Sequence, residues 1–268
     1  MTNPLLSMCL VGGEFSEIAE FACTLATEAA LCTTSHFRKP LDVHVKADQS
    51  PVTIADQKTE RLIRDMIAAT YPAHGLLGEE HGIEGRDNDE IWVIDPIDGT
   101  KSFISGLPQY GTLIAYLKDR EVRVGAISMP ELKEFWIGID GDGCFFNGVR
   151  CSVSKCDQLA EAILMTTSVE YLSEKHQSRF AALTRQARVR RYGGDCYIYA
   201  MVASGWADVA VDTGLQYYDY MAVIPIIEEA GGVITDWSGR RPGLNSDGTI
   251  LAAATPALHR QALELLTR

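Results

Sequence analysis

The chain has 268 residues, of which 46% are hydrophobic, and its formal net charge is −12 at pH 7. This length and apolar content are enough for a large buried core in one or two compact domains. The acidic balance argues against a general nucleic-acid binder, which needs a basic surface to displace counterions. An acidic protein can still bind phosphate if it first gathers cations.

The sequence also argues against membrane and disulfide-rich classes of protein. No run of about 18 or more apolar residues occurs, and residues 1–13 lack the basic start and the apolar length of a secretion signal. We therefore expect a cytoplasmic protein with no membrane partner. The seven cysteines form an odd set without a CxxC pair, which favours reduced, mostly buried thiols over a disulfide framework or a zinc site.

The first half of the chain, residues 1–150, combines helical patterns with short strands. Apolar residues recur at helical spacing over 14–36 and over about 53–69, where Thr53 followed by Asp56 is a plausible helix start. Turn residues then separate four strand-like runs, at 91–94, 112–118, 122–129 and 134–139. This half is predicted to pack helices on an antiparallel sheet.

The second half, residues 151–268, alternates between strands and helices. Strand-like runs occur at about 162–167, 188–192 and 208–212, and near residues 233 and 250. Helical patterns occur at 176–187, 195–204 and 220–230 and at the C-terminus. The alternation indicates a layered α/β half. Pro225 would lie inside the helix over 220–230, where proline removes a hydrogen bond and tends to kink the helix.

Two aspartates, Asp95 and Asp98, lie at the end of an apolar run in the stretch IWVIDPIDGT. Pro96 and Gly99 fix a turn that lets both carboxylates converge. Converging carboxylates repel unless a cation lies between them, and Mg²⁺ commonly takes one or two carboxylates plus waters and phosphate oxygens. Alternatively, the two side chains only cap and hydrogen-bond the turn.

Other acids end or follow apolar runs in the same way. Glu79 and Glu80 end the run LLGEE, and Asp219 precedes a predicted helix. A solvated loop would explain the two glutamates, and an ordinary N-cap would explain Asp219 without a metal. The neighbouring residues favour a site, because lysine and hydroxyl side chains gather over 46–56 and the Gly99–Thr100 segment offers backbone N–H groups to an anion.

The stretch from Asp95 to Thr100, with the sequence DPIDGT, resembles the signature of the inositol monophosphatase family of metal-dependent, lithium-sensitive phosphatases. Matching companions occur in order, at Gly78-Glu79-Glu80, from Pro51 to Asp56, and from Tyr218-Asp219 to Gly232. The resemblance covers essentially the whole chain after the first dozen residues. It implies an α/β fold, the five-layered α-β-α-β-α sandwich of the inositol monophosphatase and fructose-1,6-bisphosphatase type, and a homodimer.

The resemblance implies a ligand set for two to three Mg²⁺ ions per active site. Glu79, Asp95 and the carbonyl of Ile97 would hold one ion. Asp95, Asp98 and Asp219 would hold a second, and a third, weaker ion would lie near Glu79. Mn²⁺ could substitute for Mg²⁺, and Li⁺ would inhibit.

The resemblance also implies catalytic roles. Thr100, oriented by Asp56, would help Glu79 position and deprotonate the attacking water. The backbone of Gly99 and Thr100 would hold the phosphate. The chemistry would be a direct attack of metal-activated water on the phosphoryl group, without a phosphoenzyme.

Three further stretches resemble the histidinol-phosphate phosphatase branch of the family. They run from Lys101 to Gly106, from Gly193 to Tyr197, and from Tyr217 to Tyr220 with Pro225 following. L-histidinol phosphate carries an ammonium group and an imidazole, so its pocket needs acids that no metal uses.

Asp195 and Asp212 are the expected pocket acids, beside Asp219, which would contact both metal and substrate. In inositol phosphatases the position of Asp212 is typically a longer glutamate, and that of Asp195 is small or hydroxylated. Two extra carboxylates facing a cationic leaving group are electrostatically sensible. Alternatively, Asp195 is the N-cap of the helix over 195–204, and Asp212 is a turn acid at the end of a strand.

The leading expectation is therefore a histidinol-phosphate phosphatase of histidine biosynthesis. One alternative is an inositol or broad-specificity sugar or nucleotide phosphatase of the same family. Another is a binding or regulatory homologue without catalysis, although such a chain would have lost an expected acid or Thr100. The six histidines show no paired ligand spacing, and the basic run Arg188, Arg190 and Arg191 is expected to be a solvated strand.

Overall fold

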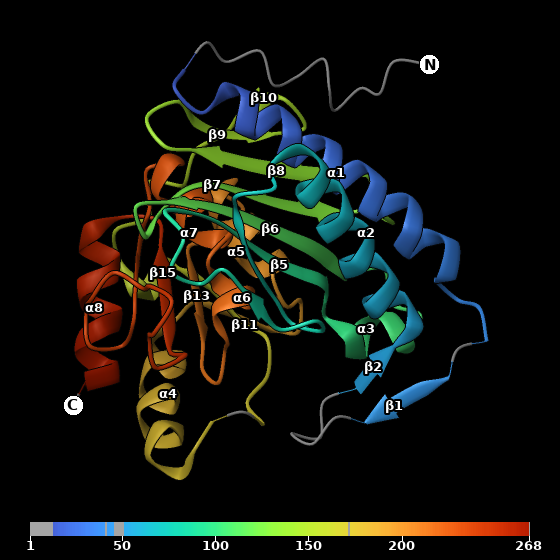
Figure 1. The fold of residues 1–268 in the computed structure, drawn as a ribbon. Helices are drawn as coiled ribbons and strands as arrows, with labels where there is room; N and C mark the ends of the chain where they lie inside the picture. Colours follow the sequence, from blue (N-terminus) through green and yellow to red (C-terminus); the bar gives the residue numbers. More distant parts are fainter. Residues whose placement is uncertain (1–12, 41, 46–50, 171, 268) are drawn as a thin grey trace.

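The computed structural model describes residues 13–40, 42–45, 51–170 and 172–267 (Figure 1). Its larger sheet has eight strands in the order β10-β9-β8-β7-β6-β5-β3-β4. All neighbours are antiparallel except β3 and β5, which are parallel. The strands are β3 (Gly75–Gly78), β4 (Ile83–Glu84), β5 (Glu90–Asp98), β6 (Gly111–Lys118), β7 (Glu121–Met129), β8 (Glu134–Ile139), β9 (Gly143–Phe146) and β10 (Val149–Arg150).

Two long helices, α1 (Ser16–His36) and α2 (Ile54–Thr70), cover one face of this sheet (Figure 1). A small hairpin of β1 (Val43–Val45) and β2 (Pro51–Thr53) precedes α2. The predicted start of α2 is confirmed as a capping box. The Thr53 hydroxyl oxygen accepts the Ala55 N–H at 3.1 Å, and Asp56 Oδ2 accepts the Thr53 N–H at 2.8 Å. Both helices lie within two residues of their predicted positions.

The smaller sheet has five strands in the order β12-β11-β13-β15-β14. Strand β11 runs parallel to β12 and β13, whereas β15 is antiparallel to β13 and β14. The strands are β11 (Ile163–Thr166), β12 (Val189–Tyr192), β13 (Val209–Asp212), β14 (Val233–Thr235) and β15 (Ile250–Ala253). The strand-helix alternation predicted for this half is confirmed.

The helices complete the layers. The remaining ones are α3 (Thr100–Ile104), the 3₁₀ turn η1 (Leu159–Glu161), α4 (Glu174–Gln186), α5 (Tyr197–Ala203), α6 (Tyr217–Tyr220), α7 (Val223–Glu229) and α8 (Pro256–Thr267). Helices α5 and α7 lie between the two sheets, and α8, with α4 packed against it, covers the outer face of the smaller sheet (Figure 1). The order is α-β-α-β-α, as predicted.

Two glycines let α7 approach the larger sheet closely. A Cβ at Gly125 of β7 would lie 2.0 Å from the carbonyl oxygen of Ala222, and one at Gly138 of β8 would lie 2.5 Å from the Pro225 backbone. Any larger residue at either position would push the helix off the sheet. This close packing fixes where the residues just before α7, including Asp219 of α6, lie.

The helix predicted over 220–230 is in fact two helices. Helix α6 ends at Tyr220, and α7 begins at Val223. Pro225 therefore lies in the first turn of α7, not in a helix interior as predicted. Its missing N–H costs no hydrogen bond there, because the first N–H groups of a helix have no intrahelical acceptor.

The two sheets draw their strands from opposite sides of residue 150. One hydrophobic cluster nevertheless contains Leu77 together with Tyr199 and Val223, so side chains of both halves pack in one core. The division into residues 1–150 and 151–268 stays a prediction. None of the helices in the described part of the chain is long and apolar enough to cross a membrane.

Candidate active site

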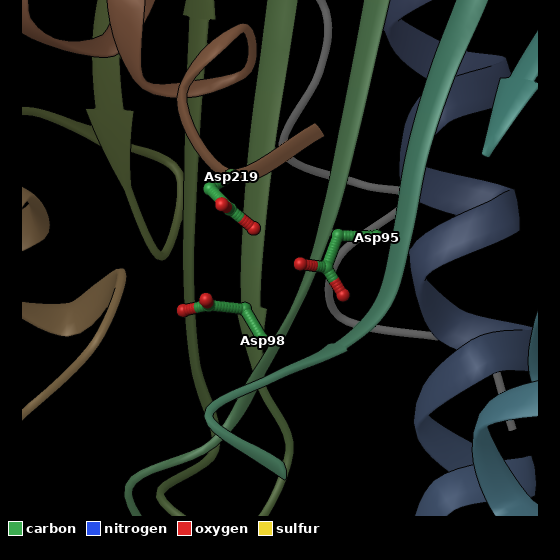
Figure 2. A group of neighbouring side chains, drawn as sticks. All are labelled: Asp95, Asp98 and Asp219. Carbon is green, nitrogen blue, oxygen red and sulfur yellow. The ribbon is translucent and has the colours of Figure 1, made fainter. Parts of the chain in front are cut away.

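Three aspartates from distant parts of the chain converge at the end of β5. Asp95 and Asp98 belong to β5 and Asp219 to α6, and one carboxylate oxygen from each lies within 4.8 Å of the others. Figure 2 shows these three side chains gathered in one region. The convergence predicted for Asp95 and Asp98 is therefore present in the structure.

A break in strand pairing explains how residues three apart can face the same point. In a regular strand, side chains at that spacing point to opposite faces of the sheet. The pairing of β5 with β6 shifts register between Asp95, opposite Leu113, and Asp98, opposite Gly111. An irregularity of this kind re-aims side chains near active sites. The Ile97 N–H donates to Asp95 Oδ1 at 3.1 Å within it.

Asp219 is held by its own short helix. The N–H of Gln216 donates to Asp219 Oδ2 at 2.6 Å, in a capping box that opens α6. Asp219 is thus the third residue of α6 and not the N-cap of a helix over 220–230, because the chain breaks between α6 and α7. One carboxylate oxygen caps the helix, and the side chain still reaches Asp95 and Asp98.

The protein environment disfavours negative charge on these acids. Burial raises the pKa of Asp95 well above its usual range, and the negative charges of Glu79, Asp98 and Asp219 raise it further. Burial likewise raises the pKa of Asp98 and, for Asp219, raises the pKa to about 7. Carboxylate oxygens are the ligands that Mg²⁺ prefers, and a cation between them offsets their mutual repulsion. The residues present therefore fit a hard divalent cation.

A cavity of about 490 Å³ opens over the cluster. Its lining includes the three aspartates and, among the other predicted residues, Glu79, Ile97, Gly99, Thr100, Asp195 and Asp212. Glu79 follows directly on β3, and its charge raises the pKa of Asp95 and of Asp219. One predicted residue, Asp56, is not among the cavity-lining residues of the described chain and lies behind Thr100.

Thr100 connects the cavity with the start of α2. Its hydroxyl lies 3.4 Å from Asp56 Oδ1 and 3.0 Å from the carbonyl oxygen of Ile97. Asp56 is buried, and its other carboxylate oxygen accepts the N–H and the hydroxyl of Thr53 at 2.8 and 2.6 Å. The capping box of α2 therefore fixes the carboxylate that orients Thr100.

Asp195 projects into the cavity from the loop before α5. Its Oδ2 accepts a hydrogen bond from the Ser102 hydroxyl at 3.1 Å, and a Cβ at Gly99 would lie 2.8 Å from that oxygen. Gly99 also has φ of +82°, so only glycine suits this position. The N-cap alternative for Asp195 is wrong, because Cys196 is the N-cap residue of α5.

Asp212 is the last residue of β13, and both of its carboxylate oxygens accept hydrogen bonds from the protein. Oδ1 accepts the Thr166 hydroxyl at 2.9 Å and the Thr167 N–H at 2.8 Å, and Oδ2 accepts the hydroxyls of Thr167 and Tyr199 at 3.0 and 3.1 Å. Burial raises the pKa of Asp212 to about 6, although these hydrogen bonds oppose the rise. Asp212 borders the cavity, and its substrate role stays a prediction.

Sequence reasoning missed the residues that hold the predicted acids in place. The Cys196 N–H donates to Asp98 Oδ2, and Tyr199 donates to Asp212. These contacts span 98 and 13 residues of sequence, so no local pattern signals them. Gln216 precedes Asp219 at the spacing of a capping box, but glutamine is not among the residues that usually begin one. Lys46 and Ser50, which the sequence also placed near the site, lie outside the described residues.

The comparison with known families agrees with this geometry. The model of the inositol monophosphatase family matches residues 14–268. The chain belongs to the inositol monophosphatase family. As a member of it, the chain is a phosphatase of the phosphoric monoester hydrolase class, which acts on small phosphorylated substrates.

The names of individual relatives point to more than one substrate. The chloroplastic bifunctional phosphatase IMPL2 of Arabidopsis thaliana is 40% identical over 94% of this chain and 76% of its own length. A histidinol-phosphatase of Chlorobaculum parvum is 40% identical over 87% of this chain and 91% of its own. The solved structure of an inositol monophosphatase from Zymomonas mobilis superposes with a TM-score of 0.88 at 36% identity, covering 96% of this chain and all of that one.

Proposed function

We propose that this inositol monophosphatase family member is a Mg²⁺-dependent histidinol-phosphate phosphatase, converting L-histidinol phosphate and water into L-histidinol and phosphate. The observation that carries the proposal is Asp195, a carboxylate in the cavity wall outside the converged cluster of Asp95, Asp98 and Asp219. An acid that no metal uses is available to a cationic leaving group. The similarity to a histidinol-phosphatase at 40% identity supports the same substrate.

Asp95, Asp98 and Asp219 would hold Mg²⁺ together with Glu79 and the carbonyl of Ile97, for two to three ions per site. Mg²⁺ in such a site polarises the phosphoryl group, favours ionised water at neutral pH and stabilises the leaving oxygen. The buried carboxylate of Asp95 lies in a lower dielectric than water, so its attraction for a divalent ion is stronger there. The repulsion that raises the pKa of Asp95 is relieved by the same ion.

The chain's own residues position the water and the phosphate. Thr100, whose hydroxyl lies 3.4 Å from the buried Asp56 carboxylate, orients the attacking water, and Glu79 accepts its proton. The first N–H groups of α3 after Gly99 have no intrahelical acceptor and can donate to phosphate oxygens. Catalysis of phosphoryl transfer rests mainly on such positioning and electrostatics.

Substrate choice would come from residues 151–268, and most metal ligands from residues 1–150. Asp195 would face the ammonium or imidazole of the substrate from the cavity wall beside Asp98. Asp212 would act partly through Thr167, which also lines the cavity and donates its hydroxyl to that carboxylate. Asp219 would contact both metal and substrate. The homodimer, the cytoplasmic location, the use of Mn²⁺ and the inhibition by Li⁺ are further predictions of this assignment.

A second candidate is an inositol-1-phosphate or broad-specificity phosphatase. The similarity at 36% identity to the inositol monophosphatase from Zymomonas mobilis favours it. In the structure, Asp212 supports this candidate as well, because its oxygens already accept four hydrogen bonds and are less available to a cationic substrate.

The deciding experiment measures phosphate release from L-histidinol phosphate and from inositol 1-phosphate side by side, with Mg²⁺ and with a chelator. A large Mg²⁺-dependent preference for histidinol phosphate is expected. Comparable rates, or a preference for inositol phosphate, would keep the metal mechanism and reject the substrate assignment. Release of phosphate from neither ester in the presence of Mg²⁺ would reject the proposed function as a whole.

A further inference from the structure

A buried ion pair in α2 lies against the turn that carries Glu79. Glu60 Oε1 and Arg64 Nε are 2.7 Å apart, and the two side chains are 0% and 3% exposed. Burying two charges costs more desolvation energy than a single contact returns, so such a pair needs further hydrogen bonds. Both residues find those partners in the turn between β3 and β4.

Backbone groups of this turn supply most of the partners. Glu60 Oε2 accepts the Glu80 N–H at 2.6 Å, and Oε1 accepts the His81 N–H at 3.1 Å. Arg64 Nη2 donates to the carbonyl oxygen of Gly82. The two ends of one ion pair therefore bind opposite sides of the same turn and fix its conformation.

The base of the turn fits tightly around this pair. A Cβ at Gly78 would lie 2.1 Å from Glu60 Oε1, so only glycine lets the end of β3 approach the carboxylate. The Gly78 N–H donates to the Gly82 carbonyl oxygen at 3.1 Å and closes the turn. Glu79 lies between these fixed points and lines the cavity, whereas neither Glu60 nor Arg64 is among the lining residues of the described chain.

We propose that Glu60 and Arg64 form a positioning pair, which holds the backbone of residues 78–82 so that Glu79 is directed at the metal site. The inference rests on the proposed function, because it needs Glu79 as a metal ligand. The pair acts through the backbone on either side of Glu79 and does not touch substrate. Outer residues that orient a metal ligand commonly change metal affinity by roughly 10- to 100-fold when replaced.

The test is calorimetric titration of the metal-free protein with Mg²⁺, comparing wild type with Glu60→Gln. The amide keeps the shape of the side chain but turns one acceptor into a donor that opposes the Glu80 or His81 N–H. The Mg²⁺ dissociation constant is expected to rise roughly 10- to 100-fold. The matched control is Glu84→Gln, which changes the exposed partner of Arg64, 3.2 Å away, and should leave Mg²⁺ affinity unchanged.

Folding and binding effects are separated by measuring urea unfolding of the metal-free variants. Lower stability of Glu60→Gln with wild-type Mg²⁺ affinity means that the pair only stabilises the fold, and the inference is wrong. If Glu60→Gln does not fold, Arg64→Lys takes its place, since lysine keeps the charge but cannot reach Glu60 and Gly82 with a planar fork. A wild-type protein that binds no Mg²⁺ would overturn the proposed function and this inference together.

A separate observation concerns two thiols at the other end of the larger sheet. Cys144 in β9 and Cys151 after β10 are neighbours across a hairpin, where the Cys151 N–H donates to the Cys144 carbonyl oxygen at 2.9 Å. Their Sγ atoms are 3.5 Å apart. Cys144 is buried, while Cys151 is partly exposed. Facing residues of an antiparallel pair lie within the Cα separation that a disulfide spans.

We infer that Cys144 and Cys151 are a site of reversible oxidation by hydrogen peroxide. Peroxide would convert the Cys151 thiol into a sulfenic acid and water, and the Cys144 sulfur would then displace a second water to form the disulfide. In total, two thiols and one peroxide give one disulfide and two waters. Contact with the Cys144 thiol lowers the pKa of Cys151, which favours attack by its thiolate.

Trypsin separates the two cysteines, because Arg150 lies between them. After peroxide and alkylation, mass spectrometry is expected to find peptide 134–150 linked to peptide 151–155, at a mass about 2 Da below the sum of the two thiols, and dithiothreitol should reverse it. The link should persist in Cys156→Ser and vanish in Cys151→Ser. Sulfinic acid at Cys151 without a link, or no oxidation, would overturn the inference.

Discussion

The Ser102 hydroxyl donates a hydrogen bond to Asp195 Oδ2 at 3.1 Å and so ties the helix after the DPIDGT motif to the loop before α5. Burial raises the pKa of Asp195, and the Ser102 hydrogen bond together with the nearby charge of Lys101 opposes that rise. The side chain is therefore oriented at the cavity wall by a neutral hydrogen-bond partner.

Asp195→Asn removes that charge and keeps an oxygen for Ser102. We expect kcat/KM for L-histidinol phosphate to fall roughly 10- to 100-fold, as for loss of a charged hydrogen bond, and kcat/KM for inositol 1-phosphate to stay nearly constant. Steady-state kinetics on both esters provide the measurement. Asp157→Asn, at an exposed position, controls for the change in net charge. Equal losses on both esters would contradict a role in specificity.

Asp98→Asn tests the metal cluster. The amide oxygen can still accept the Cys196 N–H, so the local structure is preserved while one ligand charge is lost. Mg²⁺-dependent turnover should fall more than about 100-fold, because the metal activates the water and stabilises the transferred group. Circular dichroism should show an unchanged fold. Turnover close to that of wild type would exclude Asp98 as a metal ligand.

Sequence patterns predicted the long elements, since these are encoded locally. Helix α1, the capping box at Thr53 and Asp56, and strands β6 to β8 follow from periodicity and end signals within a few residues. The four-residue strand β3 escaped prediction, because its run is too short to show a period and its pairing with β5 depends on the tertiary fold.

Contacts between distant segments were not predictable from local patterns. Glu60 looks like an ordinary exposed residue of an amphipathic helix, yet its carboxylate is fully buried beneath the turn that bears Glu79. The register shift between Asp95 and Asp98 likewise appears only when β5 pairs with β6. The family resemblance supplied the residues of the site, and the structure supplied the groups that hold them.

Asp212→Asn distinguishes a structural role from a substrate role. An amide offers one acceptor oxygen where the carboxylate satisfies four donors, so donors such as the Tyr199 hydroxyl would face an NH₂ group. The free energy of unfolding should fall by about 2 kcal/mol or more. Urea unfolding at pH 7.5 measures the loss, with Asp157→Asn as the control. Unchanged stability with reduced kcat/KM would instead favour direct contact with substrate.

His259 should make stability depend on pH. It is buried in α8, its Nε2 lies 2.8 Å from the Thr235 hydroxyl, and burial lowers its pKa from 6.5 to about 4. The contribution of His259 to the free energy of unfolding is fully present above about pH 6.5 and is lost as pH falls toward 4, because only the unfolded chain takes up the proton there. The loss is about 3 kcal/mol at most. The measurement is urea unfolding between pH 4.5 and 7. His259→Gln should lose this part of the dependence of the free energy of unfolding on pH, while the exposed control His44→Gln should keep it. Equal slopes in all three proteins would contradict the prediction.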